Sequence, residues 1–144
     1  METQNKLLSF PIRFLRFAIV GGSGVVVNMG ILYILTEYAG LYYLLSSVIA
    51  IEVSIITNFL LNDIWTWGDK KHLTGSSFFI RMLKYNISSG AAAFVGNFLT
   101  LTVLTEIFGL YYIISNLIGI AVGVLINFFL NDKWTYKIKV DYEK

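Results

Sequence analysis

Four long apolar runs, with a single proline in the whole chain, constrain the fold more than any other feature. The runs cover about Phe17–Tyr38, Tyr42–Trp65, Tyr85–Phe108 and Tyr111–Trp134. Crossing the hydrocarbon core of a bilayer takes roughly 20 mostly apolar residues in a helix. A spanning segment must also satisfy its backbone hydrogen bonds internally, which long periodic runs without proline do as helices. We therefore expect an all-α integral membrane protein with four transmembrane helices.

Composition agrees with this interpretation and excludes several classes of function. Only 14% of the 144 residues are charged, whereas soluble domains carry about 25%. We therefore expect one membrane domain over residues 1–144. A net charge of +2 gives no reason to expect a nucleic-acid partner. The chain has no cysteine and one histidine, His72. We expect no metal, no cofactor and no catalytic set such as Ser-His-Asp, and hence no enzyme activity from this chain alone.

The basic residues predict an orientation. All 11 Lys and Arg precede the first span, lie between the second and third, or lie at or after the end of the fourth. The connections around Gly40 and Gly109 have none and carry Glu37 and Glu106 instead. Short loops rich in Lys and Arg stay on the cytoplasmic side. We expect a multi-pass protein of the cell membrane with both termini and the loop at about 68–77 in the cytoplasm.

The second half of the chain repeats the first. Asn58-Phe59 and Asn127-Phe128 are 69 positions apart, as are Trp65-Thr66 and Trp134-Thr135. Upstream of the glycine-rich stretch a shift of 68 fits better, so one residue has been inserted near that stretch. Repeat one covers about 10–67 and repeat two about 78–136. Each has two spans, so we expect two helical hairpins in a parallel repeat. The repeat is either a duplicated hairpin without mechanistic meaning or a transporter-like pair.

Two pairs of cations precede the first and third spans. Arg13 and Arg16 are three residues apart, as are Arg81 and Lys84, and apolar residues flank both pairs. Residues at this spacing share one face of a helix. Each stretch therefore predicts a short interfacial helix that leads into a span. The four cations are candidates for binding a lipid phosphate, and ordinary membrane anchoring is the alternative.

Small and polar residues recur at every fourth position of the second and fourth spans. The two series are Ser46, Ala50, Ser54, Asn58 and Asn62, and Ser115, Gly119, Gly123, Asn127 and Asn131. Small residues let helices approach closely, and Asn can bond to a neighbouring helix. We expect helix packing for the small residues. For the four Asn, packing and a head-group site remain equal alternatives. Asp63 and Asp132 follow Asn62 and Asn131 and belong to the same head-group or structural set, where we expect them to pair with the cations across the repeat.

Two further features lie within the expected spans. Gly21–Gly24 and residues 90–93 are small-residue stretches, for which we favour close packing over a phosphate cradle at a helix start. Glu52 lies near the middle of the second span, and Asn28 and Asn97 lie near the middle of the first and third. An ionisable residue at this depth is by default a hypothesis for function. We expect Glu52 to line a translocation path, with fixing of helix register as the alternative. For Asn28 and Asn97, lining of that path and hydrogen bonding between helices remain equal alternatives.

The segment Phe17–Gly21, the signature at Asn58–Trp67 and its second copy at Asn127–Tyr136 resemble the GtrA-like family. The chain is also similar to the membrane domain of some archaeal dolichol-phosphate mannosyltransferases. Many members carry a basic residue after the signature Asn, where this chain has Asp63 and Asp132. Any role of that basic residue in the family is therefore not expected at Asp63 or Asp132.

The resemblance implies flipping of a dolichyl- or undecaprenyl-phosphate sugar for cell-surface polysaccharide or glycoconjugate synthesis. The alternative is a non-catalytic anchor or scaffold for a cytoplasmic glycosyltransferase. A small proton-coupled exporter is less favoured, since such exporters place their Glu in the first span, whereas Glu52 lies in the second. The expected partners are the lipid-linked sugar, a membrane-associated glycosyltransferase and the bilayer, and a homodimer is left open.

Overall fold

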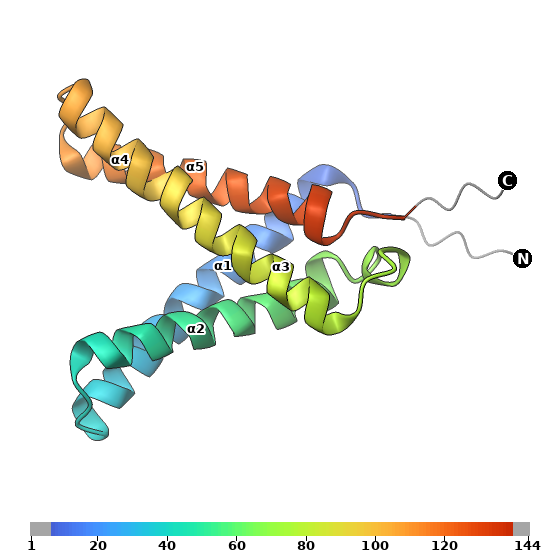
Figure 1. Ribbon diagram of the computed structural model, residues 1–144, viewed down its shortest axis with the longest axis horizontal. Coiled ribbons are helices and arrows are strands. Elements are labelled where there is room, and N and C mark those ends of the chain that lie inside the picture. Colours follow the sequence, from blue (N-terminus) through green and yellow to red (C-terminus); the bar gives the residue numbers. More distant parts are fainter. Residues whose placement is uncertain (1–6, 140–144) are drawn as a thin grey trace, which may run out of the picture. The chain divides into compact units, whose positions relative to one another are not determined.

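A computed structural model of the chain describes residues 7–139, apart from the side chains of residues 112 and 113. Its first half is a hairpin of two helices (Figure 1). Helix α1 (Phe10–Tyr33) continues into the π-helical turn η1 (Ile34–Tyr38), and α2 (Tyr43–Leu61) continues into the π-helical turn η2 (Asn62–Thr66). This half forms a compact unit that ends at His72.

The second half forms another compact unit, from Leu73 onward. Its first arm runs through α3 (Phe78–Ala91), the π-helical segment η4 (Ala92–Leu99), α4 (Thr100–Thr102) and η5 (Val103–Ile107). Its second arm is α5 (Tyr112–Leu130) followed by η6 (Asn131–Thr135). A short 3₁₀ turn, η3 (Lys71–Leu73), lies at the boundary between the units.

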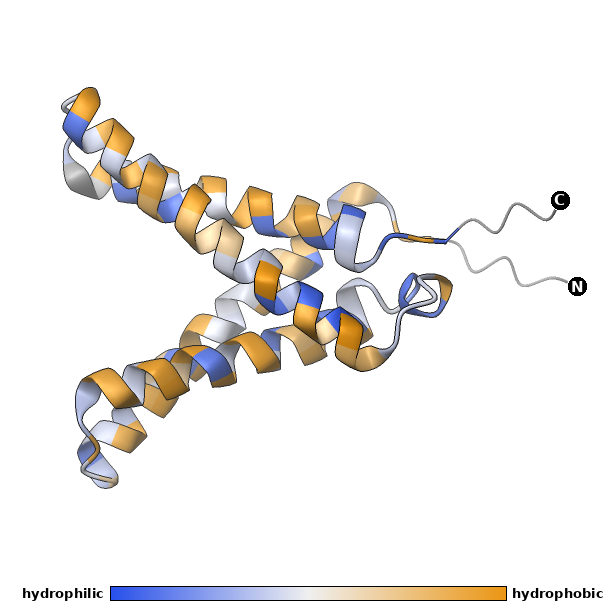
Figure 2. Cartoon of the chain, in the orientation of Figure 1, coloured by the Kyte–Doolittle hydropathy of each residue, from blue (hydrophilic) through white to orange (hydrophobic). Residues whose placement is uncertain are grey.

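Four helices in the described part of the chain are long and apolar enough to cross a membrane. They are Phe10–Tyr38, Tyr43–Thr66, Phe78–Ile107 and Ile114–Thr135. Figure 2 shows hydrophobic residues along the outer faces of these helices. Many large apolar side chains there are exposed, among them Val26, Val48 and Leu117. Such surfaces need lipid around them, so the predicted all-α membrane fold with four spans is confirmed.

The π-helical segment η4 lies where the spacing between the two halves changes. Helices α1 and α3 begin at Phe10 and Phe78, which are 68 positions apart. Beyond η4 the paired elements are 69 apart, as Tyr43 and Tyr112 show at the starts of α2 and α5. A π-helical hydrogen bond joins residues five apart, so it encloses one residue more than the α-helical bond. Segment η4 therefore accommodates the extra residue without breaking the helix.

The short interfacial helices expected before the first and third spans are not separate elements. The residues concerned form the first turns of α1 and α3, which run on into the spans. Pro11 lies in the first turn of α1, where its missing N–H costs nothing, and no proline interrupts the helix afterwards. Gly21–Gly24 consequently lies inside α1, so no helix start is available there to cradle a phosphate.

Both hairpin tips turn on a glycine. Gly40 and Gly109 each have a φ of 65°, in the left-handed region that glycine enters without steric cost. The N–H groups of the residues that follow, Leu41 and Leu110, bond back to the carbonyls of Leu35 and Leu104, both at 3.0 Å. Each first arm thus ends in a closed turn, and the second arm starts a few residues later.

Each hairpin closes along the row of small residues on its second arm. In the first half Ser46 and Ala50 are fully buried, and the Ser54 hydroxyl donates to the Gly24 carbonyl at 2.8 Å. In the second half Gly96 lies directly against the backbone of Gly123. The packing predicted for the small residues is therefore present in both halves. It brings the two arms close enough for backbone contact.

Candidate functional site

A polar groove lies within the first hairpin, between α1 and α2. It has a volume of about 290 Å³ and is lined by Gly21, Gly24, Val25, Asn28, Ile51, Ser54, Ile55 and Asn58. Two of the predicted candidates, Asn28 and Asn58, thus come from different helices to the same groove. The remaining lining residues are small or aliphatic. This polar groove thus combines aliphatic walls with a few polar groups, within two helices that can span a bilayer.

Close contact between the helices forms the floor of this groove. The Asn58 side chain lies so near Gly24 that a Cβ atom at residue 24 would collide with the carboxamide. Asn58 Oδ1 is buried and has no hydrogen-bond partner within the part of the chain that the structure describes. A buried acceptor without a donor is costly. This acceptor is packed against Gly24, so a ligand hydroxyl would reach it only after the Asn58 side chain moved.

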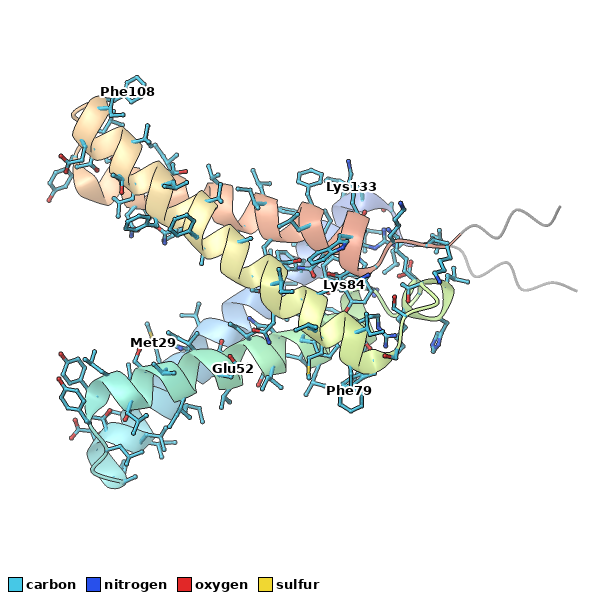
Figure 3. All side chains as sticks on the ribbon, in the orientation of Figure 1. Met29, Glu52, Phe79, Lys84, Phe108 and Lys133 are labelled. Carbon is cyan, nitrogen blue, oxygen red and sulfur yellow. The ribbon has the colours of Figure 1, made fainter. Side chains whose placement is uncertain are left out.

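The other two mid-span candidates lie elsewhere. Glu52 is exposed midway along α2 (Figure 3) and is not among the residues that line the groove. Asn97 belongs to η4 in the second half, where it packs against Gly119. A Cβ atom at Gly119 would come within 3.0 Å of the Asn97 carbonyl oxygen. The structure thus brings Asn28 together with Asn58, and places Glu52 on another face of α2.

At the basic end of the first half, the cations bond to groups of the protein itself. The Arg13 guanidinium is 5% exposed, and its Nη2 lies 2.6 Å from Asp69 Oδ2. The same carboxylate oxygen accepts the Leu8 N–H at 2.8 Å. Arg16 Nη1 donates to the Trp65 carbonyl at 2.9 Å, and the guanidinium lies 5.3 Å from the centre of the Trp65 ring. Both predicted phosphate ligands of this half are therefore held in place by their own hairpin.

The two aspartates that follow the signature Asn residues differ in burial. Asp63 is buried, and its Oδ2 lies 3.9 Å from Lys71 Nζ. Asp132, its counterpart in η6, is partly buried. Asp63 thus lies beside a cation of its own half, Lys71, and its expected pairing with the Arg and Lys pairs across the repeat stays a prediction.

The signature Asn residues stabilise the π-helical turns that end both second arms. Asn62 is fully buried, and its Oδ1 accepts the Thr66 hydroxyl at 2.5 Å. Asn131 is also fully buried and donates through Nδ2 to Asn127, at 2.9 Å to the carbonyl and 2.8 Å to Oδ1. The Trp67 and Tyr136 N–H groups close the turns on the Asn62 and Asn131 carbonyls, each at 2.8 Å. This arrangement favours packing over head-group binding for Asn62 and Asn131.

The basic end of the second half contains an open pocket that includes only one of the predicted cations. Arg81 is 8% exposed and donates through Nη1 to the Ser76 carbonyl at 2.6 Å. Lys84 lines the pocket together with Lys137 and Lys139. Sequence reasoning counted these last two lysines for orientation and missed them as site residues. A comparison of the two halves could have pointed to Lys137, because it occupies the position of Gly68 in the first half.

One known protein family matches most of this chain. The family described as GtrA/DPMS, transmembrane domain, matches residues 16–95 and 84–144. The chain belongs to this family. The GtrA/DPMS domain is 36% identical over 124 residues to a dolichol-phosphate mannosyltransferase of Pyrococcus furiosus. The match covers 86% of this chain and 34% of that protein, so this GtrA/DPMS domain spans about a third of its relative.

Proposed function

We propose that this GtrA/DPMS membrane domain moves a polyprenyl-phosphate-linked sugar across the membrane. The polar groove between α1 and α2 carries the proposal, because it places Asn28, Ser54 and Asn58 inside a helix pair long enough to span a bilayer. The family relationship supplies the ligand class, since the Pyrococcus relative is named for a dolichol-phosphate sugar. The domain itself is proposed to be non-catalytic.

The groove fits the part of such a lipid that resists crossing. Sugar hydroxyls are costly to bury without hydrogen-bond partners. Asn28 and Asn58 offer both amide donors and carbonyl acceptors, and Asn58 Oδ1 is buried without a partner in the described chain. The volume of about 290 Å³ is at the lower end of the range for small-molecule sites. The polyprenyl tail would stay in lipid along the exposed apolar faces of the helices.

A scaffold role is a second candidate, favoured by one observation. In the Pyrococcus relative the matching region is about a third of a protein that is named as a mannosyltransferase. A membrane domain joined to a transferase can serve to hold that enzyme beside its lipid substrate without moving the lipid. The two roles differ in a measurable way, because only translocation delivers the sugar to the opposite leaflet when no transferase is present.

Replacing the polar groups of the groove should slow translocation. We expect Asn28→Leu with Asn58→Leu to reduce the rate about tenfold, because each lost hydrogen bond removes roughly 0.5–1.5 kcal/mol. The measurement is the appearance of a labelled polyprenyl-phosphate sugar in the opposite leaflet of vesicles that contain this chain and no glycosyltransferase. Met29→Leu is the control, since Met29 is exposed beside the groove residues on α1 (Figure 3).

Two results would contradict this proposal. One is a rate in the double variant equal to that of the wild type. The other is an absence of translocation by the wild-type chain, together with stimulation of an added transferase, which would identify the scaffold role instead.

The orientation proposed for this function is cytoplasmic for both basic ends and for the loop between the halves. Reporter fusions at Gly40 and Gly109 should then read as outside, and a fusion at Lys71 as inside, because Lys and Arg are absent from the tips and abundant at the other ends. Reporter activity at each site in intact cells provides the measurement. A cytoplasmic signal at Gly40 would reverse the leaflet from which the lipid is collected.

A further inference from the structure

We propose that the basic end of the second half binds a phosphate group, and that the corresponding end of the first half is closed by its own carboxylate. The binding partner is a phosphate monoester or diester, which either a polyprenyl lipid head group or a soluble phosphate could supply. The assignment to a lipid rests on the proposed function. The phosphate site itself rests on a pocket and on a difference between the two halves.

The pocket is cationic and large enough for a head group. Its volume is about 560 Å³, and it is lined by Thr74, Ser76, Lys84, Trp134, Lys137, Ile138 and Lys139. None of these lining residues, all within the described part of the chain, is acidic. Each lysine offers a compact positive charge with three donors, and the Ser76 hydroxyl can donate as well. Three ammonium groups around one cavity favour a group with more than one negative charge.

Hydrogen bonds within the second half hold the walls of this pocket. The Lys139 N–H donates to the Leu73 carbonyl at 3.0 Å, which fixes the segment after η6 beside the segment before α3. The Ser76 N–H donates to the Thr74 hydroxyl at 3.1 Å, and Arg81 Nη1 binds the Ser76 carbonyl at 2.6 Å. The pocket is thus formed before any ligand binds, which lowers the entropy lost on binding.

An aromatic residue sets the depth of the pocket in the membrane. Lys84 Nζ lies 5.7 Å from the centre of the Trp134 ring, and Trp134 is 40% exposed. Tryptophan is enriched at the level of lipid head groups. A phosphate held between Lys84 and the lysines after η6 would therefore lie at the level of phosphates in the bilayer. Its hydrocarbon chain could enter the lipid directly alongside α3 or α5.

The first half differs from this pocket at two corresponding positions. With the shift of 69, Ile138 of the pocket corresponds to Asp69, and Lys137 corresponds to Gly68. The Asp69 carboxylate binds Arg13 at 2.6 Å and also accepts the Leu8 N–H. A carboxylate in that place neutralises the arginine and repels a phosphate. The duplicated halves are therefore unequal, with anion binding assigned to the second.

A binding experiment tests the site without any transport. The full chain is placed in nanodiscs of phosphatidylcholine, and bound undecaprenyl phosphate is measured by native mass spectrometry. We expect Lys84→Gln with Lys137→Gln and Lys139→Gln to weaken binding at least about tenfold, because the phosphate loses its charge-assisted hydrogen bonds to three ammonium groups. Ile138→Asp should weaken binding to a similar extent, since it introduces the acid that closes the first half.

Lys133→Gln is the matched control. Lys133 is exposed in η6, carries the same charge and does not line the pocket, and Figure 3 labels it on a different arm from Lys84. Its removal should leave binding unchanged. Equal weakening by Lys133→Gln and by the triple variant would show a general attraction of charge and overturn the site. Unchanged binding in both the triple variant and Ile138→Asp would also overturn it.

A competition arm identifies the source of the phosphate. Lipid binding that millimolar inorganic phosphate does not displace supports a lipid head group, and displacement supports a soluble phosphate at the same lysines. Failure of the site and failure of the proposed function are separable. Intact lipid binding without translocation contradicts the function alone, whereas translocation by the triple variant with unchanged lipid binding contradicts the site alone.

Discussion

Gly96→Ala is expected to separate the two arms of the second hairpin and to lower its stability. A Cβ atom at residue 96 would collide with the Cα and N atoms of Gly123. Those are backbone atoms, so no side-chain rotation can relieve the collision and the helices must move apart. Overpacking of this kind costs about 1–3 kcal/mol, which exceeds the gain of up to about 1 kcal/mol from the better helix propensity of alanine.

Gly90→Ala in the same arm is the control for this prediction. Outside the adjacent backbone of its own helix, no atom of the described residues lies within 4 Å of a Cβ atom built at Gly90. This variant should be as stable as the wild type or more stable by up to about 1 kcal/mol. The measurement is the temperature at which each purified variant loses its monodisperse peak in mild detergent. Equal stability of the two variants would mean that η4 and α5 do not make the backbone contact described above.

The spans and the close packing within hairpins could be predicted from the sequence, because both depend on local patterns. Length and apolarity determine the spans, and the row from Ser46 to Asn62 defines the packed face of α2 without knowledge of its partner. The change of shift from 68 to 69 located an insertion. It could not show that the helix takes up the extra residue as η4, since that depends on the hydrogen bonds of the folded arm.

The candidate site was predictable only in part, because it depends on which side chains meet. Asn28 and Asn58 were candidates, and they do line one groove. Asp69 was not predicted as a site residue, since it lies in the polar loop after the second span and its counterpart is the apolar Ile138. Its place beside Arg13 depends on the turn that follows η2. The pocket around Lys137 and Lys139 likewise depends on the folded chain, so the sequence alone indicates only a basic tail at these lysines.

Asp69→Asn is expected to be the most destabilising single change in the first half. The Asp69 side chain is 13% exposed, and its Oδ2 lies 2.6 Å from Nη2 of Arg13, whose side chain is 6% exposed. Removing one partner of a buried ion pair costs about 3–5 kcal/mol, because the buried Arg13 charge then loses the carboxylate that compensates it. Asparagine keeps the shape of the side chain and an acceptor for the Leu8 N–H, so the loss reports the charge.

A double variant separates the ion pair from simple packing. Replacing a buried pair by apolar residues of similar size is often neutral for stability. Arg13→Met with Asp69→Leu should therefore recover most of the stability that Asp69→Asn loses. Ile138→Asn, at the corresponding position of the second half, should change stability much less, because Ile138 lines an open pocket. Thermal unfolding of the four proteins in one detergent measures all these differences. If Asp69→Asn and Ile138→Asn are equally stable, the carboxylate does not close the first half, and the proposed inequality of the two basic ends loses its structural basis.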